Sequence, residues 1–516
     1  MSILPIPQCL RSAAGLGCLL LALASLPLSA TAQTVPRNKT LIIAQNFDPQ
    51  TLWPNGTTAS TNLNAGAAVV EPLFWINPAT NKLEGVLATS YTQQSPTVHR
   101  IELRKGVRFS NGEPLNADAL LHTLGVFVDK AVTPAYSIYA APMEKFEKVD
   151  DHTVLIHTKG PYPAMGLALT QIYAIPPVYW KQAGAAKFAQ APIGTGPFKF
   201  TEWVKDDRVV MDRNPQYWGA APKGIDRVIW KPVPDDTARA VGLEAGEYDI
   251  AASLSGSAVP RLQGQRNLQL YSVNSYRLFT MILSALPKHQ SPLLDKRVRQ
   301  AINHAIDNEA IVKNLFYGKA QVLQGQVLRR EQLGFDPDIK AYPFDLAKAR
   351  SLLAAAGFPN GFEIDFKIPS GRYAQDREVC EAIAGMLAKV GIKAKIIALE
   401  GGEFLRQLRT QELGPMSFVG LAPPDDPHFQ VSQYRSDWRY TFIQNPELDK
   451  LIDDGVKEPD VAKRAAIYKR AMRIIHDEAP VVPMFQGLDI YGSSSRVKGL
   501  RPSGDQRLFL YGVSLE

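Results

Sequence analysis

The sequence predicts a soluble α/β protein with more than one domain. At 516 residues the chain is too long for a single hydrophobic core, so two or three domains are expected. Hydrophobic residues make up 45% and charged residues 21%, values typical of folded soluble proteins. A strand at 363–368, a helix at 374–390 and a strand at 393–399 form a β-α-β unit. These observations together indicate the α/β class.

The first 32 residues have the pattern of a secretory signal. Arg11 precedes a mostly apolar stretch at 13–28, and Ala30-Thr31-Ala32 supplies the small residues that a signal peptidase needs before Gln33. Lipidation at Cys18 is the alternative, but Cys18 lies inside the apolar stretch and not at its end. No later run approaches the ~18 apolar residues of a membrane span. We therefore expect export of a free, soluble protein to the periplasm.

The number of cysteines and the distribution of charge limit which disulfides and which partners are expected. Cys9 and Cys18 belong to the signal segment, so Cys380 alone remains and cannot form an intramolecular disulfide. The net charge of +7 comes from basic residues interspersed with acids. This distribution indicates a solvated basic surface and no nucleic-acid partner.

The first part of the chain alternates strands and turns. A strand at 40–45 ends in the polar loop 46–49, and another strand is expected at 99–103. Asn111-Gly112 is a strong turn signal, and Asn116 is a good N-cap for the helical run that follows. A further strand is expected at 154–158.

The segment 192–251 begins with the turn P-I-G-T-G-P-F-K-F. Gly194 and Gly196 allow backbone angles that other residues avoid, and the prolines stiffen the turn. Alternating apolar residues then predict two half-buried strands, followed by a helix at 237–245 and a strand at 248–252.

The later part of the chain is richer in helices. Strands at 269–273 and 276–283 precede a helical region expected at 294–317. Its apolar face contains Val298, Ala301, Ile302, Ala305 and Ile306. Asp345 is expected to cap a helix that Gly357 ends, and strand segments recur at 481–485 and 490–491.

Four motifs resemble one family. They are the 192–200 turn, N-P-Q-Y-W-G at 214–219, A-G-E-Y-D-I at 245–250, and the stretch 103–119. They resemble the extracytoplasmic solute-binding proteins of ABC transporters, the family that takes up peptides, opines, glutathione and nickel chelates. The resemblance implies a two-lobed periplasmic binding protein fold, with an extra subdomain in the first lobe and a two-strand hinge.

The resemblance also implies a division of the chain. The expected parts are the signal 1–32, lobe I at 33–75, an inserted subdomain at 76–191, the second part of lobe I at 192–271, lobe II at 272–482, and a return to lobe I at 483–516. Two crossings between the lobes, near 272 and 484, make the hinge. Lobe closure around a solute is the expected mode of action.

No catalytic, cofactor or metal site is expected. G-T-G-P-F-K at 194–199 lacks the third glycine of a phosphate loop, and neither G-x-S-x-G nor H-E-x-x-H occurs. His428 lies in a motif of the nickel branch, but the position of that branch's ligand histidine holds Arg439. Nickel prefers imidazole or thiolate ligands, so direct nickel binding is not expected, whereas binding of a metal chelate stays open.

The solute site departs from that of the peptide-binding members. These members carry an aspartate that pairs with the peptide's amino group in A-D-Y-x-D-P, and here Pro423 occupies that position. Asp425 is a candidate substitute, two residues away; the alternative is a solvated loop acid, which is the more common case. Arg277 and Arg372 are candidates for a carboxylate, because a guanidinium binds one bidentately; the alternative for each is a surface arginine.

The expected ligand-binding residues come from five places in the chain. They are Asn46, Phe47, Tyr276, Arg277, Arg372, Tyr373, Leu421, Asp425, Asp426 and Gln486. The partners expected from the resemblance are a small organic solute and an inner-membrane ABC permease on which a monomer docks. A nickel-chelate carrier, a secreted hydrolase and a sensor or chaperone are the alternatives.

Overall fold

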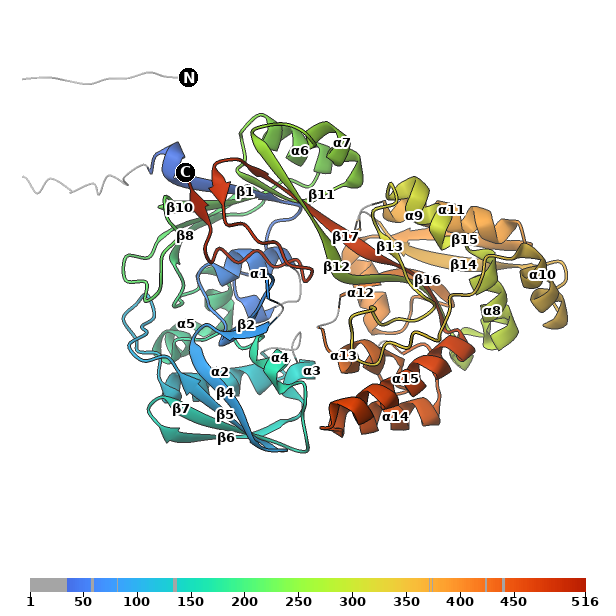
Figure 1. The fold of residues 1–516 in the computed structure, drawn as a ribbon, viewed down its shortest axis with the longest axis horizontal. Helices are drawn as coiled ribbons and strands as arrows, with labels where there is room; N and C mark the ends of the chain where they lie inside the picture. Colours follow the sequence, from blue (N-terminus) through green and yellow to red (C-terminus); the bar gives the residue numbers. More distant parts are fainter. Residues whose placement is uncertain are drawn as a thin grey trace, which may run out of the picture.

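The computed structural model describes residues 35–56, 60–80, 82–132, 137–370, 372–373, 375–422, 425–438 and 441–516. Its two lobes are joined by two long strands, β12 (Leu268–Leu283) and β17 (Val481–Ser494) (Figure 1). Outside the described residues lie the predicted signal segment 1–32 with its cleavage site before Gln33, Pro423 and Arg439.

The two long strands pair antiparallel along most of their length, from Leu268 opposite Ser494 to Ile282 opposite Val481. The separate strands predicted at 269–273 and 276–283 are therefore parts of one strand. Their register shifts between Asn274 and Leu278, so the polar residues between the two predictions form an irregularity and not a break.

One eleven-stranded sheet passes through both lobes in the order β15-β14-β16-β12-β17-β11-β1-β10-β9-β8, with β13 pairing with β17. Its remaining strands are β1 (Thr40–Gln45), β8 (Phe198–Val204), β9 (Arg208–Arg213), β10 (Arg227–Pro232), β11 (Ile250–Leu254), β13 (Gln321–Val322), β14 (Phe362–Pro369), β15 (Ile392–Leu399) and β16 (Met416–Leu421). Both lobes are thus continuous with the pair of strands that connects them.

Lobe I contains the β1 end of this sheet. Its helices are α1 (Ser60–Ala67), α6 (Asp236–Glu244) and α7 (Val259–Leu262), and its buried core includes Leu41, Met211 and Trp230. The C-terminal segment returns here: β18 (Val497–Lys498) pairs with β19 (Ser514–Leu515), and Leu500, Leu508 and Val513 join the same core.

The turn glycines of lobe I act differently from the prediction. Neither Gly194 nor Gly196 has a positive φ. A Cβ added to Gly194 would lie 2.0 Å from the Val69 carbonyl oxygen, and one added to Gly196 would lie 2.6 Å from that of Ala68. These glycines are required by close backbone packing and not by backbone angle.

Glu71 is a fully buried acid that contacts two of the family motifs, the 192–200 turn and the 214–219 segment. Its carboxylate accepts hydrogen bonds from the side chains of Tyr217, Trp218 and Thr195 at 2.9 Å, and from the Tyr511 hydroxyl at 3.2 Å. Burial raises the pKa of Glu71 to about 7, although the four donors oppose this rise. Within the described part of the chain it makes no ion pair, so neutral donors alone satisfy it.

A second sheet, with strand order β4-β5-β7-β6, forms the subdomain of lobe I. Its strands are β4 (Ala88–Ser95), β5 (Val98–Leu103), β6 (Met143–Asp150) and β7 (Thr153–Thr158); the helices are α2 (Ala117–Val128), α3 (Ser137–Ala140), α4 (Met165–Leu169) and α5 (Pro177–Gln190), and β2 (Phe74–Asn77) and β3 (Lys82–Gly85) form a hairpin. Asn116 caps α2 as predicted, because its side chain accepts the Ala119 N–H at 3.0 Å.

Lobe II carries most of the helices. They are α8 (Lys296–Ala305), α9 (Asn308–Leu315), α10 (Leu346–Ala355), α11 (Asp376–Ala388), α12 (Gly401–Arg409), α13 (Pro427–Val431), α14 (Pro446–Lys457) and α15 (Val461–Glu478). The helical region expected at 294–317 contains two helices: α8 ends at Ala305, and Asp307 caps α9 by accepting the Ala310 N–H at 2.9 Å. The predicted cap Asp345 is confirmed.

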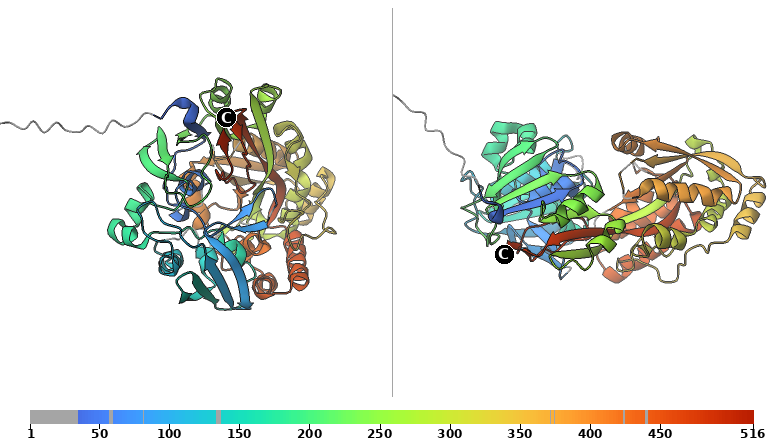
Figure 2. Two further views of the ribbon diagram at one scale, coloured as in Figure 1. Left: turned by 60° about the vertical axis from the view of Figure 1, so that its left-hand side comes forward. Right: turned by 90° about the horizontal axis from the view of Figure 1, so that it is seen from above.

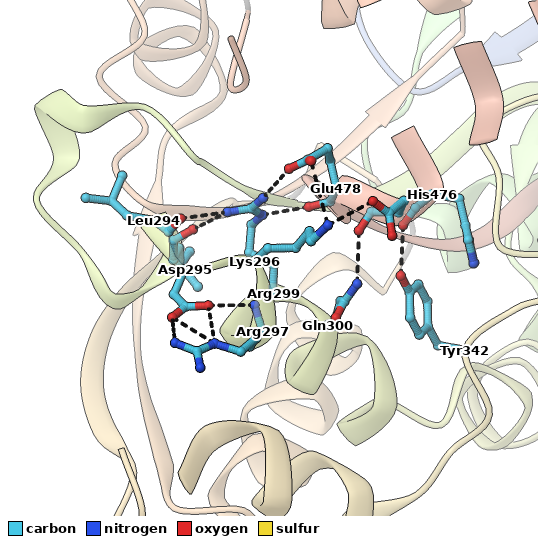
Figure 3. A network of polar contacts seen from close by, with 11 residues as sticks. Leu294, Asp295, Lys296, Arg297, Arg299, Gln300, Tyr342, His476 and Glu478 are labelled. Carbon is cyan, nitrogen blue, oxygen red and sulfur yellow. Dashed lines mark hydrogen bonds and ion pairs between the residues drawn. The ribbon is translucent and has the colours of Figure 1, made fainter. Parts of the chain in front are cut away.

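The carboxyl end of α15 is held in place where it leads into β17. Figure 3 shows Tyr342, Gln300 and Arg299 donating to the last carbonyls of the helix, at 2.8 to 3.0 Å. The buried Arg299 also pairs with the Glu478 carboxylate at 3.0 Å. These contacts fix the start of a strand that runs into lobe I.

The lobes also touch at a point away from the long strands. Phe429 on α13 of lobe II packs against Tyr139 on α3 of lobe I, with ring centroids 4.8 Å apart. Phe429 is 2% exposed and belongs to the hydrophobic cluster of the lobe I subdomain. Figure 1 shows α3 and α13 facing each other, and Figure 2 shows the long strands passing between the lobes.

Candidate functional site

The irregularity in β12 is the centre of the candidate site. At this point the Tyr276 N–H does not bond to β17 but donates to the Gly504 carbonyl of the C-terminal segment at 2.5 Å. The Gln486 side chain, which is 3% exposed, donates to the Ser275 carbonyl at 2.8 Å. The backbone of Arg277 is thereby fixed by both neighbouring segments.

The Arg277 guanidinium connects the two lobes. Its Nη1 donates to the Gly420 carbonyl of β16 at 2.9 Å, and its Nη2 donates to the Gln506 side-chain oxygen at 3.2 Å. Its Cζ lies 5.4 Å from the centroid of the Tyr373 ring, within the range of a cation–π contact.

Arg372 lies on the same tyrosine. Its Nε donates to the Tyr373 hydroxyl at 3.2 Å, and that hydroxyl donates to the Gly420 carbonyl at 3.0 Å. The backbone N–H groups of Arg372 and Tyr373 both donate to Asp376. The structure therefore brings together three of the predicted residues, Arg277, Arg372 and Tyr373, which we call the arginine cluster.

The two guanidinium groups of the arginine cluster are surrounded by neutral groups. Arg277 and Arg372 are both half-buried, and their guanidinium groups contact a carbonyl, an amide, a hydroxyl and an aromatic ring. In the ranges that the structure describes, neither guanidinium forms an ion pair with a carboxylate. A partly desolvated guanidinium without an acid favours an anion that comes from outside the protein.

Gly420 makes this geometry possible. A Cβ at this position would lie 2.6 Å from Phe279 Cε1 and 3.0 Å from Arg277 Cδ. Only glycine leaves room for the arginine stem while its carbonyl accepts bonds from both Arg277 and Tyr373.

Asp425 and Asp426 lie in ion pairs of their own. Asp425 pairs with Arg329, whose Cζ lies 4.2 Å from the Tyr276 ring centroid and whose Nε also donates to Glu331. Burial raises the pKa of Asp425, and the charge of Arg329 opposes this rise. The candidate substitute for an amine anchor is thus engaged by a protein cation.

Asp426 accepts two bonds from Arg464, at 2.7 and 2.8 Å, and caps α13 through the His428 N–H. The side chains of Arg464 and Asp426 are 6% and 12% exposed. This pair fixes the helix that carries Phe429, and both oxygens of Asp426 are used within lobe II.

The other predicted residues lie around this centre. Phe47 is 47% exposed and its carbonyl accepts a bond from Gln45, while Asn46 is half-buried after β1. Leu421 ends β16 and pairs with Leu278. Sequence reasoning did not identify Arg329, Gln506 or Asp489 as part of the site. Of the three, only Arg329 lies in a charged stretch, with Arg330 and Glu331, that could have drawn attention to it.

The described ranges offer neither a metal site nor a membrane-spanning helix. These ranges hold no group of three or more His, Cys, Asp or Glu side chains placed to bind a metal ion. Burial lowers the pKa of His428 to about 4. In the same part of the chain no helix has the length and apolarity to cross a membrane.

Comparisons with known proteins agree with this architecture. Residues 82–442 match the model of bacterial extracellular solute-binding proteins, family 5. The glutathione-binding protein GsiB of Escherichia coli (strain K12) is 29% identical over 468 residues, covering 86% of this chain and 88% of GsiB.

Two solved structures extend the likeness to the fold. The periplasmic binding protein DppA from Helicobacter pylori, in complex with the peptide STSA, has a TM-score of 0.81 and 26% identity, covering 92% of this chain and 98% of DppA. NikA from Brucella suis, in complex with Fe(III)-EDTA, has a TM-score of 0.81 and 25% identity, covering 92% and 100%. With a two-lobed α/β fold and a family model that matches most of its length, the chain belongs to the bacterial extracellular solute-binding proteins of family 5, the solute-capturing components of ABC importers.

Proposed function

We propose that this protein captures a small organic solute with at least one carboxylate, in the class of short or modified peptides, opines and related compounds. The observation that carries the proposal is the arginine cluster, where two guanidinium groups contact one tyrosine and, among the residues that the structure describes, no acid. A carboxylate that binds there forms charge-assisted hydrogen bonds in a partly desolvated place.

The proposed mechanism is closure of the two lobes around the solute. The division of the chain near 272 and 483 leaves β12 and β17 as the connections on which the lobes rotate. Arg277 donates to Gly420 of lobe II and to Gln506 of the C-terminal segment, so a solute bound to Arg277 stabilises the closed arrangement. The closed protein then docks on its inner-membrane permease and releases the solute.

The proposal also covers the location, the oligomeric state and the processing of the protein. We place the protein in the periplasm as a monomer, after cleavage of the segment 1–32 before Gln33. Intact-mass measurement of the exported chain tests the cleavage, and a lipid on Cys18 would contradict it.

An amine anchor is not required of the solute. The structure describes neither Pro423 nor its neighbour, but Asp425 and Asp426 are engaged by Arg329 and Arg464. An anionic metal chelate is a second candidate, because its carboxylates suit the same two arginines and NikA, a structural relative, is described with Fe(III)-EDTA.

The test begins with mass spectrometry of the solute that co-purifies with the native protein. Calorimetry then compares N-acetyl-dialanine, its carboxamide, glutathione and Fe(III)-EDTA. We expect binding of a carboxylate compound and loss of binding when that carboxylate is amidated. Tight binding of unmodified dipeptides that disappears on acetylation of their amino group would refute the proposal.

Lobe closure has a separate test. Small-angle scattering with and without the bound compound should show a smaller radius of gyration for the complex. An unchanged radius would count against closure without affecting the assignment of the anion site.

A further inference from the structure

Gln506 occupies an unusual position in the C-terminal segment. It has a left-handed backbone, with a φ of 65°, and its N–H donates to the Ser503 carbonyl. The turn that ends at Gln506 packs on the β12 irregularity, where Gly504 accepts the Tyr276 N–H. A non-glycine residue in this conformation is strained, and it persists where its surroundings require it.

The side chain of Gln506 connects two opposite charges. Its Oε1 accepts a bond from Arg277 Nη2 at 3.2 Å and one from the Ser60 hydroxyl at 3.4 Å. Its Nε2 donates to Asp489 Oδ1 at 2.6 Å. The charges fix the orientation of the amide, because the opposite one would set an NH₂ group against a guanidinium and an oxygen against a carboxylate.

Asp489 is an acid that has no cation in contact. It lies on β17 opposite Val273, it is 9% exposed, and within the described chain it forms no ion pair. Burial raises its pKa, whereas Gln506, the Ser275 hydroxyl and the charge of Arg277 lower it. The acid and the arginine therefore lie near each other with a neutral amide between them.

This arrangement has an electrostatic consequence. A direct pair with Asp489 would neutralise Arg277 and satisfy its donors inside the protein. The amide instead satisfies one donor of Arg277 without cancelling its charge. The turn that holds Gln506 thus keeps a cation available for an anion.

We propose that Gln506 is a positioning residue that separates Arg277 from Asp489 and keeps the guanidinium available for the carboxylate of the solute. The proposal rests on the function proposed above and adds the residue that sets the charge of the site. Gln506 acts through Arg277 and needs no contact with the solute.

Two variants test this role by calorimetry with N-acetyl-dialanine and its carboxamide. Gln506→Glu supplies an acid to Arg277, and Gln506→Met removes the three side-chain hydrogen bonds at similar length. For each we expect the Kd of the carboxylate compound to rise about ten- to a hundredfold, the value of a charge-assisted hydrogen bond. The Kd of the carboxamide should change less than about threefold, because it carries no charge for Arg277 to bind. Equal changes for both compounds, or none, would overturn the proposal.

The matched control is Gln407→Met on α12. Gln407 likewise stands between a cation and an acid, accepting from Lys367 at 2.9 Å and donating to Glu403 at 2.6 Å, but it lies outside the arginine cluster. Its substitution should leave both Kd values unchanged.

A measurement without solute separates this inference from the proposed function. In crystals of ligand-free Gln506→Met, the Arg277 guanidinium should leave its wild-type position and approach Asp489. An unchanged guanidinium would overturn the inference even where the wild type binds carboxylates. If the wild type binds neither compound, the proposed function of the site fails, and this structural comparison still decides the role of Gln506.

Discussion

Two groups of arginines lie close in the fold but have different surroundings. Arg329 and Arg464 have side chains that are 1% and 6% exposed, and each binds an acid of the 425–426 pair. Arg277 and Arg372 are half-buried and contact only neutral groups within the described chain. Burial of a charge requires a partner, so the first group is satisfied by the protein itself. The second group has no acid partner in the described part of the chain, which leaves a place for an anion from outside.

The largest expected effect is on the paired arginines. Arg464→Met leaves the Asp426 carboxylate buried without its cation, so the free energy of unfolding should fall by about 3 to 5 kcal/mol. Urea denaturation at neutral pH measures this. The double variant with Asp426→Asn should recover part of the loss, and a single-variant loss below about 1 kcal/mol would show that the pair is not structural.

The unpaired arginines should affect binding instead of stability. Arg277→Ala should weaken binding of the carboxylate solute by roughly 2 to 5 kcal/mol, since the solute's charge would be left in the site without a partner. Calorimetry on the co-purifying solute measures this, with the exposed Arg377→Ala as control. If Arg277→Ala and Arg372→Ala both leave the affinity unchanged, the distinction between the two groups does not hold for function.

Glu71 is the opposite case, a buried acid that pairs with no cation among the described residues. Because its pKa in the folded protein, about 7, exceeds the ordinary glutamate value of 4.5, the folded protein holds a proton that the unfolded chain releases between these pH values. The free energy of unfolding should therefore fall as pH rises from 4.5 to 7, by up to about 3 kcal/mol from this group. Denaturation across this range should show a smaller fall in Glu71→Gln. Equal pH dependence in the two proteins would mean that the four donors cancel the effect of burial.

The smallest expected effect tests the packing that supports the arginine cluster. Gly420→Ala places a Cβ against Phe279 and the Arg277 stem, so unfolding should become about 1 to 3 kcal/mol easier and binding should weaken. Gly385→Ala in α11, where a Cβ meets nothing within 4 Å, should be neutral or slightly stabilising. Thermal unfolding of the two variants gives the comparison, and equal melting temperatures would contradict it.

Sequence patterns predicted the parts of this fold that depend on neighbouring residues. The caps at Asn116 and Asp345 follow from local hydrogen bonds, and the family follows from motifs. The boundary between α8 and α9 was missed because the apolar periodicity continues across it, although Asp307 carried a cap signal. The role of Gly194 was also missed, because it depends on Val69 far along the chain.

The candidate site likewise depends on contacts between residues that are far apart in the sequence. Arg277 and Arg372 were found from their positions beside strands, but nothing local indicates that one tyrosine ring lies beside both. Gln506 lies 229 residues from Arg277, and Arg329 lies 96 residues from Asp425. Whether an arginine has an internal acid is decided by such distant contacts, so sequence alone could not separate the two groups.

The contact between Phe429 and Tyr139 bears on how long a solute stays bound. The Phe429 ring is buried in the other lobe, so opening under the proposed closure exposes apolar surface before the solute can leave. Burial of a phenylalanine side chain stabilises by about 1.5 to 3 kcal/mol, and this amount adds to the barrier for opening whichever solute is bound. Part of the residence time would then be a property of the protein and not of its cargo, which stopped-flow dissociation from Phe429→Ala would reveal as faster release. A carrier of this kind holds every solute longer by the same factor, so the ratio between the residence times of two solutes is still set by their own contacts.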